Sequence, residues 1–203
     1  MLNIALTGNI GAGKSEVVRR FRDWGATIID ADHLAREAER PGTEVLRAIV
    51  QRFGREVLLP SGELDRAALR GRVMGDDEAL AALNGIVHPA VRRRRDQLAT
   101  EARARGDLVL INDIPLLFES ADPSAFDLVV LVDAPEDLRR QRLIRDRALT
   151  AEEADRMIDA QIPSARKRER AGLVIDNAGT LADLDRSARA AWEEIRRRAG
   201  ATA

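Results

Sequence analysis

The sequence predicts an α/β fold in which helices cover both faces of a parallel sheet. Three observations predict it: short unbroken apolar runs typical of buried parallel strands, helical segments between these runs, and a glycine-rich loop that joins the first run to the first helix. The runs are residues 2–6, 26–29, 109–111, 128–132 and 173–175. A chain of 203 residues with 45% hydrophobic residues suits one buried core with small appendages, so residues 1–203 are expected to form a single domain.

The first strand run leads through the segment GNIGAGKS, residues 8–15, into a helix predicted over residues 16–24 from its apolar spacing. The segment matches the pattern G-x-x-x-x-G-K-[S/T], and its place between a strand and a helix is the context that confirms this motif. The backbone N–H groups of such a loop and the positive end of the following helix bind phosphate groups. The predicted ATP-binding residues of the loop are Gly8, Gly11, Ala12, Gly13, Lys14 and Ser15.

Lys14 is informative because only two of the 33 basic residues are lysines. A compact ammonium that bridges the β- and γ-phosphates suits catalysis of phosphoryl transfer, and Ser15 is expected to bind Mg²⁺. Glu16 is included in the nucleotide site through its backbone N–H, while its carboxylate would either face the α-phosphate or point to solvent. The sequence leaves both orientations open.

Carboxylates follow the second and third strand runs, at the edge of the sheet where α/β proteins bind ligands. Asp32 is predicted to orient the acceptor hydroxyl or to accept its proton, and so to be both catalytic and substrate-binding. Asp30 is expected to cap the helix that begins near His33, or to lie in the outer shell of Mg²⁺. Asp113 is expected to bind a magnesium water in the manner of a Walker-B acid.

The segment between the second and third strand runs, about seventy residues long, is too long for a simple crossover. Proline and glycine breakers divide it into a small helical subdomain, residues 32–88, and a long helix that starts at Pro89. The subdomain is predicted to bind the acceptor. His88 is predicted to contact the acceptor because it lies at the junction with the core, although a residue before proline can also serve only as a helix entry.

A second insertion, residues 139–161, is rich in arginine and helical, with an interruption near residues 148–150 typical of a helix–turn–helix lid. A helix turns by about 100° per residue, so these arginines cannot all face one ligand. Arg142 and Arg145 share a face at i, i+3 and are predicted to close over the transferred phosphoryl group as catalytic cations. The arginine run at residues 92–95 points around most of a helix and is expected to be a solvated surface.

The composition excludes several classes of protein. The chain has two histidines and no cysteine. The lack of cysteine excludes a disulfide framework, a thiolate zinc site and an iron–sulfur cluster. Its net charge of −1 gives no field that favours nucleic acid or an anionic membrane. No apolar run approaches the roughly 20 residues that span a bilayer, and the N-terminus lacks the basic region of a signal peptide. We expect a cytoplasmic chain without nucleic-acid or membrane partners.

Beyond the phosphate loop, an ordered series of motifs extends along nearly the whole chain. The series is LTGNIGAGKS, IIDADHLAREA, FGREVLLPSGELDRAAL, the pair His88-Pro89, DIPLLFE, RLIRDR, RMIDAQ and VIDNAG. With this series the chain resembles the dephospho-CoA kinase family, P-loop kinases similar to nucleoside monophosphate kinases. The resemblance implies a five-stranded parallel core, a CoA-binding subdomain at residues 32–88 and a lid at residues 139–161.

The resemblance also implies an activity: ATP- and Mg²⁺-dependent phosphorylation of the ribose 3′-hydroxyl of dephospho-CoA, which gives CoA and ADP in the last step of coenzyme A biosynthesis. Asp32 matches the family's proposed base, and Asn177 matches a position near the ATP base. Glu16 and Gly172 depart from the family pattern, which usually has Thr and Asp at these places. We expect a monomer or a weak homo-oligomer.

Two alternatives stay open. The first is another kinase of this architecture that phosphorylates a nucleoside monophosphate or a small alcohol such as shikimate. The large acceptor insertion argues against this alternative, because an insertion of that size suits a ligand with a pantetheine arm. The second is a P-loop regulatory NTPase whose switch segments respond to the nucleotide, and the arginine-rich lid argues against that.

Overall fold

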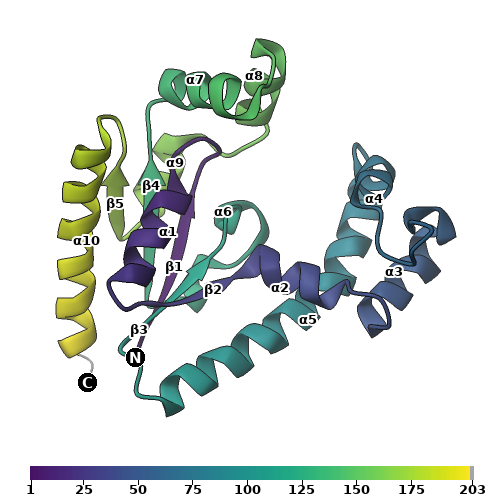
Figure 1. Ribbon diagram of the computed structural model, residues 1–203, viewed down its shortest axis with the longest axis horizontal. Coiled ribbons are helices and arrows are strands. Elements are labelled where there is room, and N and C mark those ends of the chain that lie inside the picture. Colours follow the sequence, from purple (N-terminus) through teal and green to yellow (C-terminus); the bar gives the residue numbers. More distant parts are fainter. Residues whose placement is uncertain (202–203) are drawn as a thin grey trace. The chain divides into compact units, whose positions relative to one another are not determined.

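A computed structural model describes residues 1–201 of the chain (Figure 1). The contacts divide the chain into two compact units. One unit joins Met1–Ile29 to the residues from Glu101 onward, and the other is Asp30–Thr100. They are called the core unit and the helical unit below, and each is described by itself.

The core unit contains a parallel sheet with the strand order β2-β3-β1-β4-β5 (Figure 1). The strands are β1 (Leu2–Gly8), β2 (Thr27–Asp30), β3 (Val109–Asp113), β4 (Leu128–Asp133) and β5 (Leu173–Asp176). All five predicted runs are strands, and the predicted five-stranded parallel sheet is confirmed. Because β1 lies between β3 and β4, the loop that follows it is flanked by the carboxyl ends of both neighbours.

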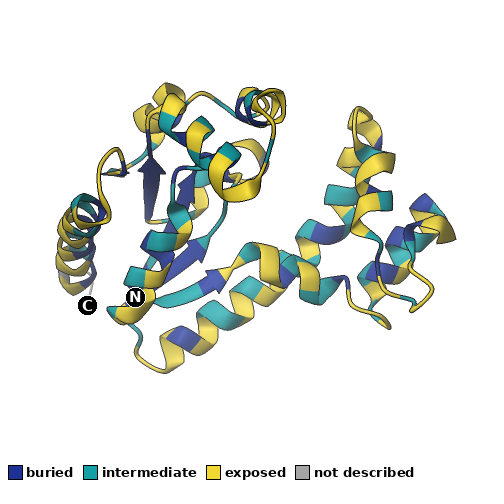
Figure 2. Ribbon diagram, turned by 45° about the horizontal axis from the view of Figure 1, so that its top comes forward, coloured by how far each residue is buried: buried dark blue, intermediate teal, exposed yellow. Residues whose placement is uncertain are grey.

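Helices cover both faces of this sheet, as predicted. The helices of the core unit are α1 (Lys14–Asp23), α6 (Leu117–Ser120), α7 (Glu136–Arg147), α8 (Ala151–Asp159), α9 (Ser164–Arg170) and α10 (Leu181–Ala201), with a 3₁₀ turn at Pro123–Ala125. Of these, α7 and α8 pack on each other beyond the ends of the strands (Figure 1). Successive residues of β1 point to opposite faces. Ile4 packs in the cluster formed with α1 and α10, whereas Ala5 packs in the cluster that contains α6. Figure 2 shows the central strands β1, β3 and β4 largely buried and the outer sides of the helices exposed.

Three aromatic rings join α1 to α10, the two helices that pack on the same face of the sheet. The ring centroids of Phe21 and Trp192 are 5.4 Å apart, and those of Trp24 and Trp192 are 6.3 Å apart. Separations in this range are favourable for tilted aromatic pairs and add to the burial of the rings. The packing therefore fixes α1, whose N-terminus follows the phosphate loop, against the last helix.

The helical unit holds α2 (Ala31–Ala38), α3 (Glu44–Phe53), α4 (Arg66–Val73), a 3₁₀ turn at Arg55–Val57 and most of α5 (Asp77–Ala104). Its own apolar cluster is built from residues on each of these helices, including Leu46, Ile49, Phe53, Leu69 and Val87. Asp30 is the N-cap of α2, and its carboxylate accepts from the His33 backbone N–H at 2.9 Å. This confirms the predicted cap.

The prediction that a long helix starts at Pro89 is wrong. α5 begins at Asp77, where Asp76 accepts from the Ala79 backbone N–H at 2.9 Å, and it continues through Pro89 to Ala104. Proline removes one i→i−4 hydrogen bond and crowds the carbonyl four residues earlier, here that of Gly85. The packing of Val87 in the apolar cluster on the same helix outweighs this cost.

The continuous α5 also changes the expectation for His88. It is an interior, half-buried helix residue, so it is not a helix entry. The compact helical unit is Asp30–Thr100, and the predicted subdomain bounds, residues 32–88, stay a prediction. The predicted helix–turn–helix at residues 139–161 is confirmed, since α7 and α8 are joined by residues 148–150 and Thr150 forms a capping box with Glu153. No helix among residues 1–201 is long and apolar enough to cross a bilayer.

Candidate active site

The phosphate loop, residues 8–15, joins β1 to α1 as predicted, with Gly8 at the end of the strand and Lys14 at the start of the helix. Gly13 is the N-cap of α1 with φ 88° and ψ 22°, a left-handed conformation that glycine adopts without a steric penalty. At Gly8 a Cβ atom would lie 2.6 Å from the Val132 carbonyl oxygen of the adjacent strand. Gly8 is therefore required by close approach to β4, and Gly13 by its dihedral angles and by the nearby side chain of Asn177.

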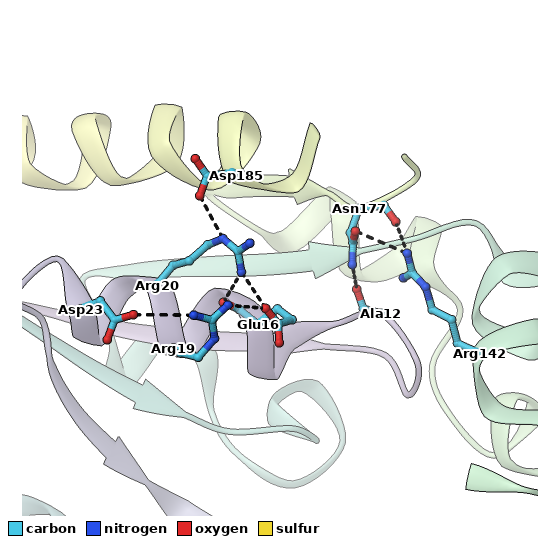
Figure 3. Close-up of polar contacts among 8 residues, drawn as sticks. All are labelled: Ala12, Glu16, Arg19, Arg20, Asp23, Arg142, Asn177 and Asp185. Carbon is cyan, nitrogen blue, oxygen red and sulfur yellow. Dashed lines mark hydrogen bonds and ion pairs between the residues drawn. The ribbon is translucent and has the colours of Figure 1, made fainter. Parts of the chain in front are cut away.

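Asn177 lies directly against the loop (Figure 3), and its predicted place near the ATP base stays a prediction. Its backbone N–H donates to the Asp133 carbonyl at 2.7 Å, and its side-chain Nδ2 donates to the Ala12 carbonyl at 2.8 Å. The residue is 6% exposed. Because Asn177 follows β5 and Asp133 ends β4, the ends of two strands position one amide against the loop.

Arg142 extends from α7 and contacts both the loop and Asn177 (Figure 3). Its guanidinium donates to the Gly11 carbonyl at 3.2 Å and to the Asn177 carbonyl at 3.0 Å. Burial, and then the nearby charge of Arg145, lower the pKa of Arg142. Its hydrogen-bond partners are neutral oxygens, so this cation is not neutralised by a carboxylate within hydrogen-bond distance among residues 1–201.

Arg145, predicted to act together with Arg142, is placed differently. Its exposed guanidinium pairs with the adjacent Asp146 at 2.6 Å, and this hydrogen bond raises the pKa of Arg145. The structure thus brings Arg142 but not Arg145 to the loop. The predicted contact of Arg145 with the transferred phosphoryl group stays a prediction.

The loop lysine and the predicted magnesium carboxylate form an ion pair. Lys14 Nζ donates to Asp113, and both side chains are largely buried. Asp113 ends β3 in register with Leu6 of β1, which explains why a carboxylate 99 positions away along the chain meets the loop. Ser15 is exposed in the first turn of α1. No cluster of three or more potential metal ligands of the His, Cys, Asp or Glu types occurs in the described part of the chain.

The side chain of Glu16 is 44% exposed, and its carboxylate is held by two arginines of its own helix, an arrangement that the sequence had also left possible. Its Oε2 accepts from Arg19 and Arg20 of the same helix, at 2.8 Å each, and these hydrogen bonds lower its pKa (Figure 3). Its backbone N–H, expected to serve the nucleotide, donates to the Gly13 carbonyl at 3.1 Å. The carboxylate is thus directed along α1 by two arginines.

Several residues of the site were missed by sequence reasoning. Gln161 Oε1 accepts from the Ile10 backbone N–H at 2.8 Å, and Asn9 Nδ2 donates to Ser164 Oγ at 2.9 Å. Both contacts tie the loop to the segment where the lid ends. The only signal in the sequence was that Gln161 closes the RMIDAQ motif.

Two predicted substrate-binding residues belong to the helical unit. Asp32 is exposed in the first turn of α2, and His88 is half-buried in α5. Asp30 rather than Asp32 caps α2, so Asp32 has no capping role. The roles of Asp32 and His88 toward the acceptor stay predictions.

Comparison with known proteins identifies the family of the chain. A family model described as dephospho-CoA kinase (CoaE) matches residues 2–183. A curated dephospho-CoA kinase of Mycobacterium tuberculosis is 46% identical over 192 residues, which are 95% of this chain and 47% of that protein. The chain thus spans about half the length of the mycobacterial relatives that it matches. A dephospho-CoA kinase of Thermobifida fusca is 42% identical over 198 residues, 98% of each chain.

Solved structures give the same result. The protein TT1252 from Thermus thermophilus has a TM-score of 0.79 and 38% identity, covering 94% of this chain and 96% of its own. A dephospho-CoA kinase from Campylobacter jejuni has a TM-score of 0.72 and 25% identity, covering 95% of this chain and 96% of its own. With the family model matching most of the sequence, the chain belongs to the dephospho-CoA kinase family.

Proposed function

We propose that this chain transfers the γ-phosphoryl group of ATP to the ribose 3′-hydroxyl of dephospho-CoA and releases CoA and ADP. The observation that carries the proposal is the convergence of Lys14, Arg142 and Asn177 on one phosphate loop in a member of this kinase family. Phosphoryl transfer needs positioning and positive charge around the transferring group more than it needs covalent chemistry. The loop, the lysine and the arginine provide both.

The charges of the site support an anionic ligand. Arg142 is partly desolvated, and within residues 1–201 it is bonded only to neutral carbonyl oxygens, so an approaching phosphate gains a charge-assisted hydrogen bond without first breaking an ion pair there. The positive end of α1 adds to the same field. Lys14 is instead paired with Asp113, and binding of ATP requires the ammonium to share or exchange that partner.

The donor set also fits Mg²⁺. Magnesium is usually held by one or two carboxylates or hydroxyls together with waters and substrate phosphates, rather than by an all-protein cage. Ser15 and Asp113 would hold it here, and the absence of a larger acidic cluster within residues 1–201 agrees with that mode. When bound, Mg²⁺ neutralises charge that develops on the phosphate oxygens. Lys14 and Arg142 add their charge to the same oxygens.

The acceptor is assigned to the helical unit. Asp32 orients the 3′-hydroxyl and accepts its proton, His88 contacts the acceptor, and Arg145 joins Arg142 over the transferred group. The chain acts in the cytoplasm as a monomer or a weak homo-oligomer, with no nucleic-acid or membrane partner. These roles extend the sequence predictions and rest on the resemblance to the family.

Release of ADP in the presence and absence of dephospho-CoA and Mg²⁺ tests the proposal. We expect turnover only with both, and none with an acceptor that lacks the 3′-hydroxyl. Lys14→Ala should keep the fold and lose turnover by orders of magnitude, since its charge acts on the transferring group. Equal ADP release without acceptor would instead indicate a regulatory NTPase, and faster turnover with shikimate or a nucleoside monophosphate would indicate another kinase.

A further inference from the structure

We propose that Arg20 is a positioning residue of the nucleotide site: it holds the carboxylate of Glu16 away from the phosphate loop, and nucleotide affinity depends on it. The inference rests on the proposed function, because it concerns the binding of ATP in that same loop. None of the hydrogen bonds of Arg20 is to residues 8–15, so its effect would be exerted through Glu16 alone.

Arg20 lies between Glu16 of its own helix and Asp185 of α10 (Figure 3). Arg20 donates to the carboxylate and to the backbone carbonyl of Glu16, at 2.8 and 3.0 Å, and its Nε donates to Asp185 of α10 at 3.1 Å. The Arg20 side chain is 11% exposed, whereas those of Glu16 and Asp185 are 44% and 45% exposed. The arginine is therefore held between two helices, and its glutamate and aspartate partners are the more exposed side chains.

Without Arg20, the Glu16 carboxylate would be attracted toward the loop. It lies in the first turn of α1, where the positive end of the helix attracts a carboxylate. That positive end is the same feature that binds the phosphates. A free Glu16 carboxylate would therefore compete with the nucleotide as an internal anion, and Arg20 removes this competitor by binding it farther along the helix.

Arg19 pairs with Glu16 at the same 2.8 Å, and its hydrogen bond is the first cause of the lowered pKa of Glu16, but its side chain is much more exposed to water than that of Arg20. Its side chain is 57% exposed, and it divides its charge between Glu16 and Asp23 (Figure 3). Exposed i, i+3 ion pairs contribute about 0.2 to 0.5 kcal/mol, too little to hold a side chain against a competing field. Arg19 is thus a matched control: it lies on the same helix and carries the same charge at the next position.

Calorimetric titration with a non-hydrolysable ATP analogue tests the proposal. We expect Arg20→Met to raise Kd about fivefold and Arg19→Met to raise it less than about twofold. In a Glu16→Gln background Arg20→Met should have no further effect, since the competing charge is gone. The fivefold defect should also shrink when the salt concentration is raised from about 0.05 M to about 0.5 M, because repulsion between partly exposed charges is screened.

Equal losses in the Arg20 and Arg19 variants, or an Arg20→Met loss that persists in the Glu16→Gln background, would overturn the inference and leave the proposed function standing. Failure of the unaltered chain to bind the analogue would refute the proposed function itself. If thermal melts show that Arg20→Met is unfolded, Arg20→Gln takes its place, since glutamine retains a donor for Asp185 but not the charge. Unchanged binding in that folded variant would also overturn the inference.

Discussion

Gly13 offers a sharp test of the geometry of the loop, because two separable effects oppose a larger residue there. Its φ of 88° is left-handed, which costs an alanine about 1 to 2 kcal/mol relative to glycine. A Cβ atom at Gly13 would also overlap Nδ2 of Asn177. The buried amide would have to move and give up its hydrogen bond to the Ala12 carbonyl, which costs about 1 to 3 kcal/mol. Gly13→Ala should therefore destabilise the fold by about 2 to 5 kcal/mol.

Gly25 is the matched control. It has a similar φ of 98°, but nothing lies within 4 Å of a Cβ built on it, so Gly25→Ala should cost only the backbone term of about 1 to 2 kcal/mol. For a chain of this size 1 kcal/mol lowers Tm by about 2 to 4 °C. Calorimetric melts should place Gly13→Ala below Gly25→Ala by several degrees. Binding of an ATP analogue should be lost in Gly13→Ala and retained in Gly25→Ala.

A double variant isolates the contact. If the extra loss in Gly13→Ala comes from Asn177, then Gly13→Ala and Asn177→Ala together should destabilise less than the sum of the single changes, because the second change removes the obstacle. Equal melting temperatures for the Gly13 and Gly25 variants, or strict additivity with Asn177→Ala, would refute the assignment of Asn177 to the loop.

Three further outcomes are expected. Asp32→Asn should lower kcat by about 10²- to 10⁴-fold with little change in ATP binding, and because Asp32 does not cap α2, a variant that loses only thermal stability would contradict its catalytic role. Ala148 has a left-handed backbone with φ 52°, so Ala148→Gly should stabilise the fold by about 1 kcal/mol in urea unfolding. Ala160 is the control: its φ is −70°, so Ala160→Gly should destabilise the fold. The Thr150 backbone N–H donates to the Glu153 carboxylate and lowers its pKa from the ordinary 4.5. The ionised carboxylate therefore stabilises the fold above pH 4.5, and this contribution is lost as the pH falls through the lowered pKa. The difference in urea midpoint between the unaltered chain and Glu153→Gln should shrink from about pH 6.5 to about pH 3.

The sequence was sufficient for the core unit. Its five apolar runs, the phosphate-loop motif and the turn at residues 148–150 each carry a local signal: burial on both faces of a parallel strand, glycines at fixed spacing, and a helix stop followed by a capping threonine. These features do not depend on distant residues, so periodicity and motif alone predict them. Lys14 and Asn177 lie together at the loop because the strand ends that carry or follow them share one edge of the sheet.

Local reasoning failed at Pro89 for a physical reason. Proline is favoured in the first turn of a helix, and that preference alone argued for a helix start. The preference is worth less than the burial of Val87 and its neighbours in the apolar cluster of the helical unit, which depends on residues that the proline rule does not consider. Asp76 supplied the true start signal, an N-cap side chain just before the helix.

The polar contacts of the site were beyond sequence reasoning for a different reason. Ile10 meets Gln161, Ala12 meets Asn177 and Arg20 meets Asp185, each pair more than 150 positions apart along the chain. A side chain that binds a distant backbone amide or carbonyl needs only the right donor or acceptor, so no period or spacing records its partner. The first two contacts hold the loop, and the third holds α1 against α10. The motif therefore predicts which residues can bind phosphate, whereas the state of the loop before ATP arrives is set by distant residues that no motif includes.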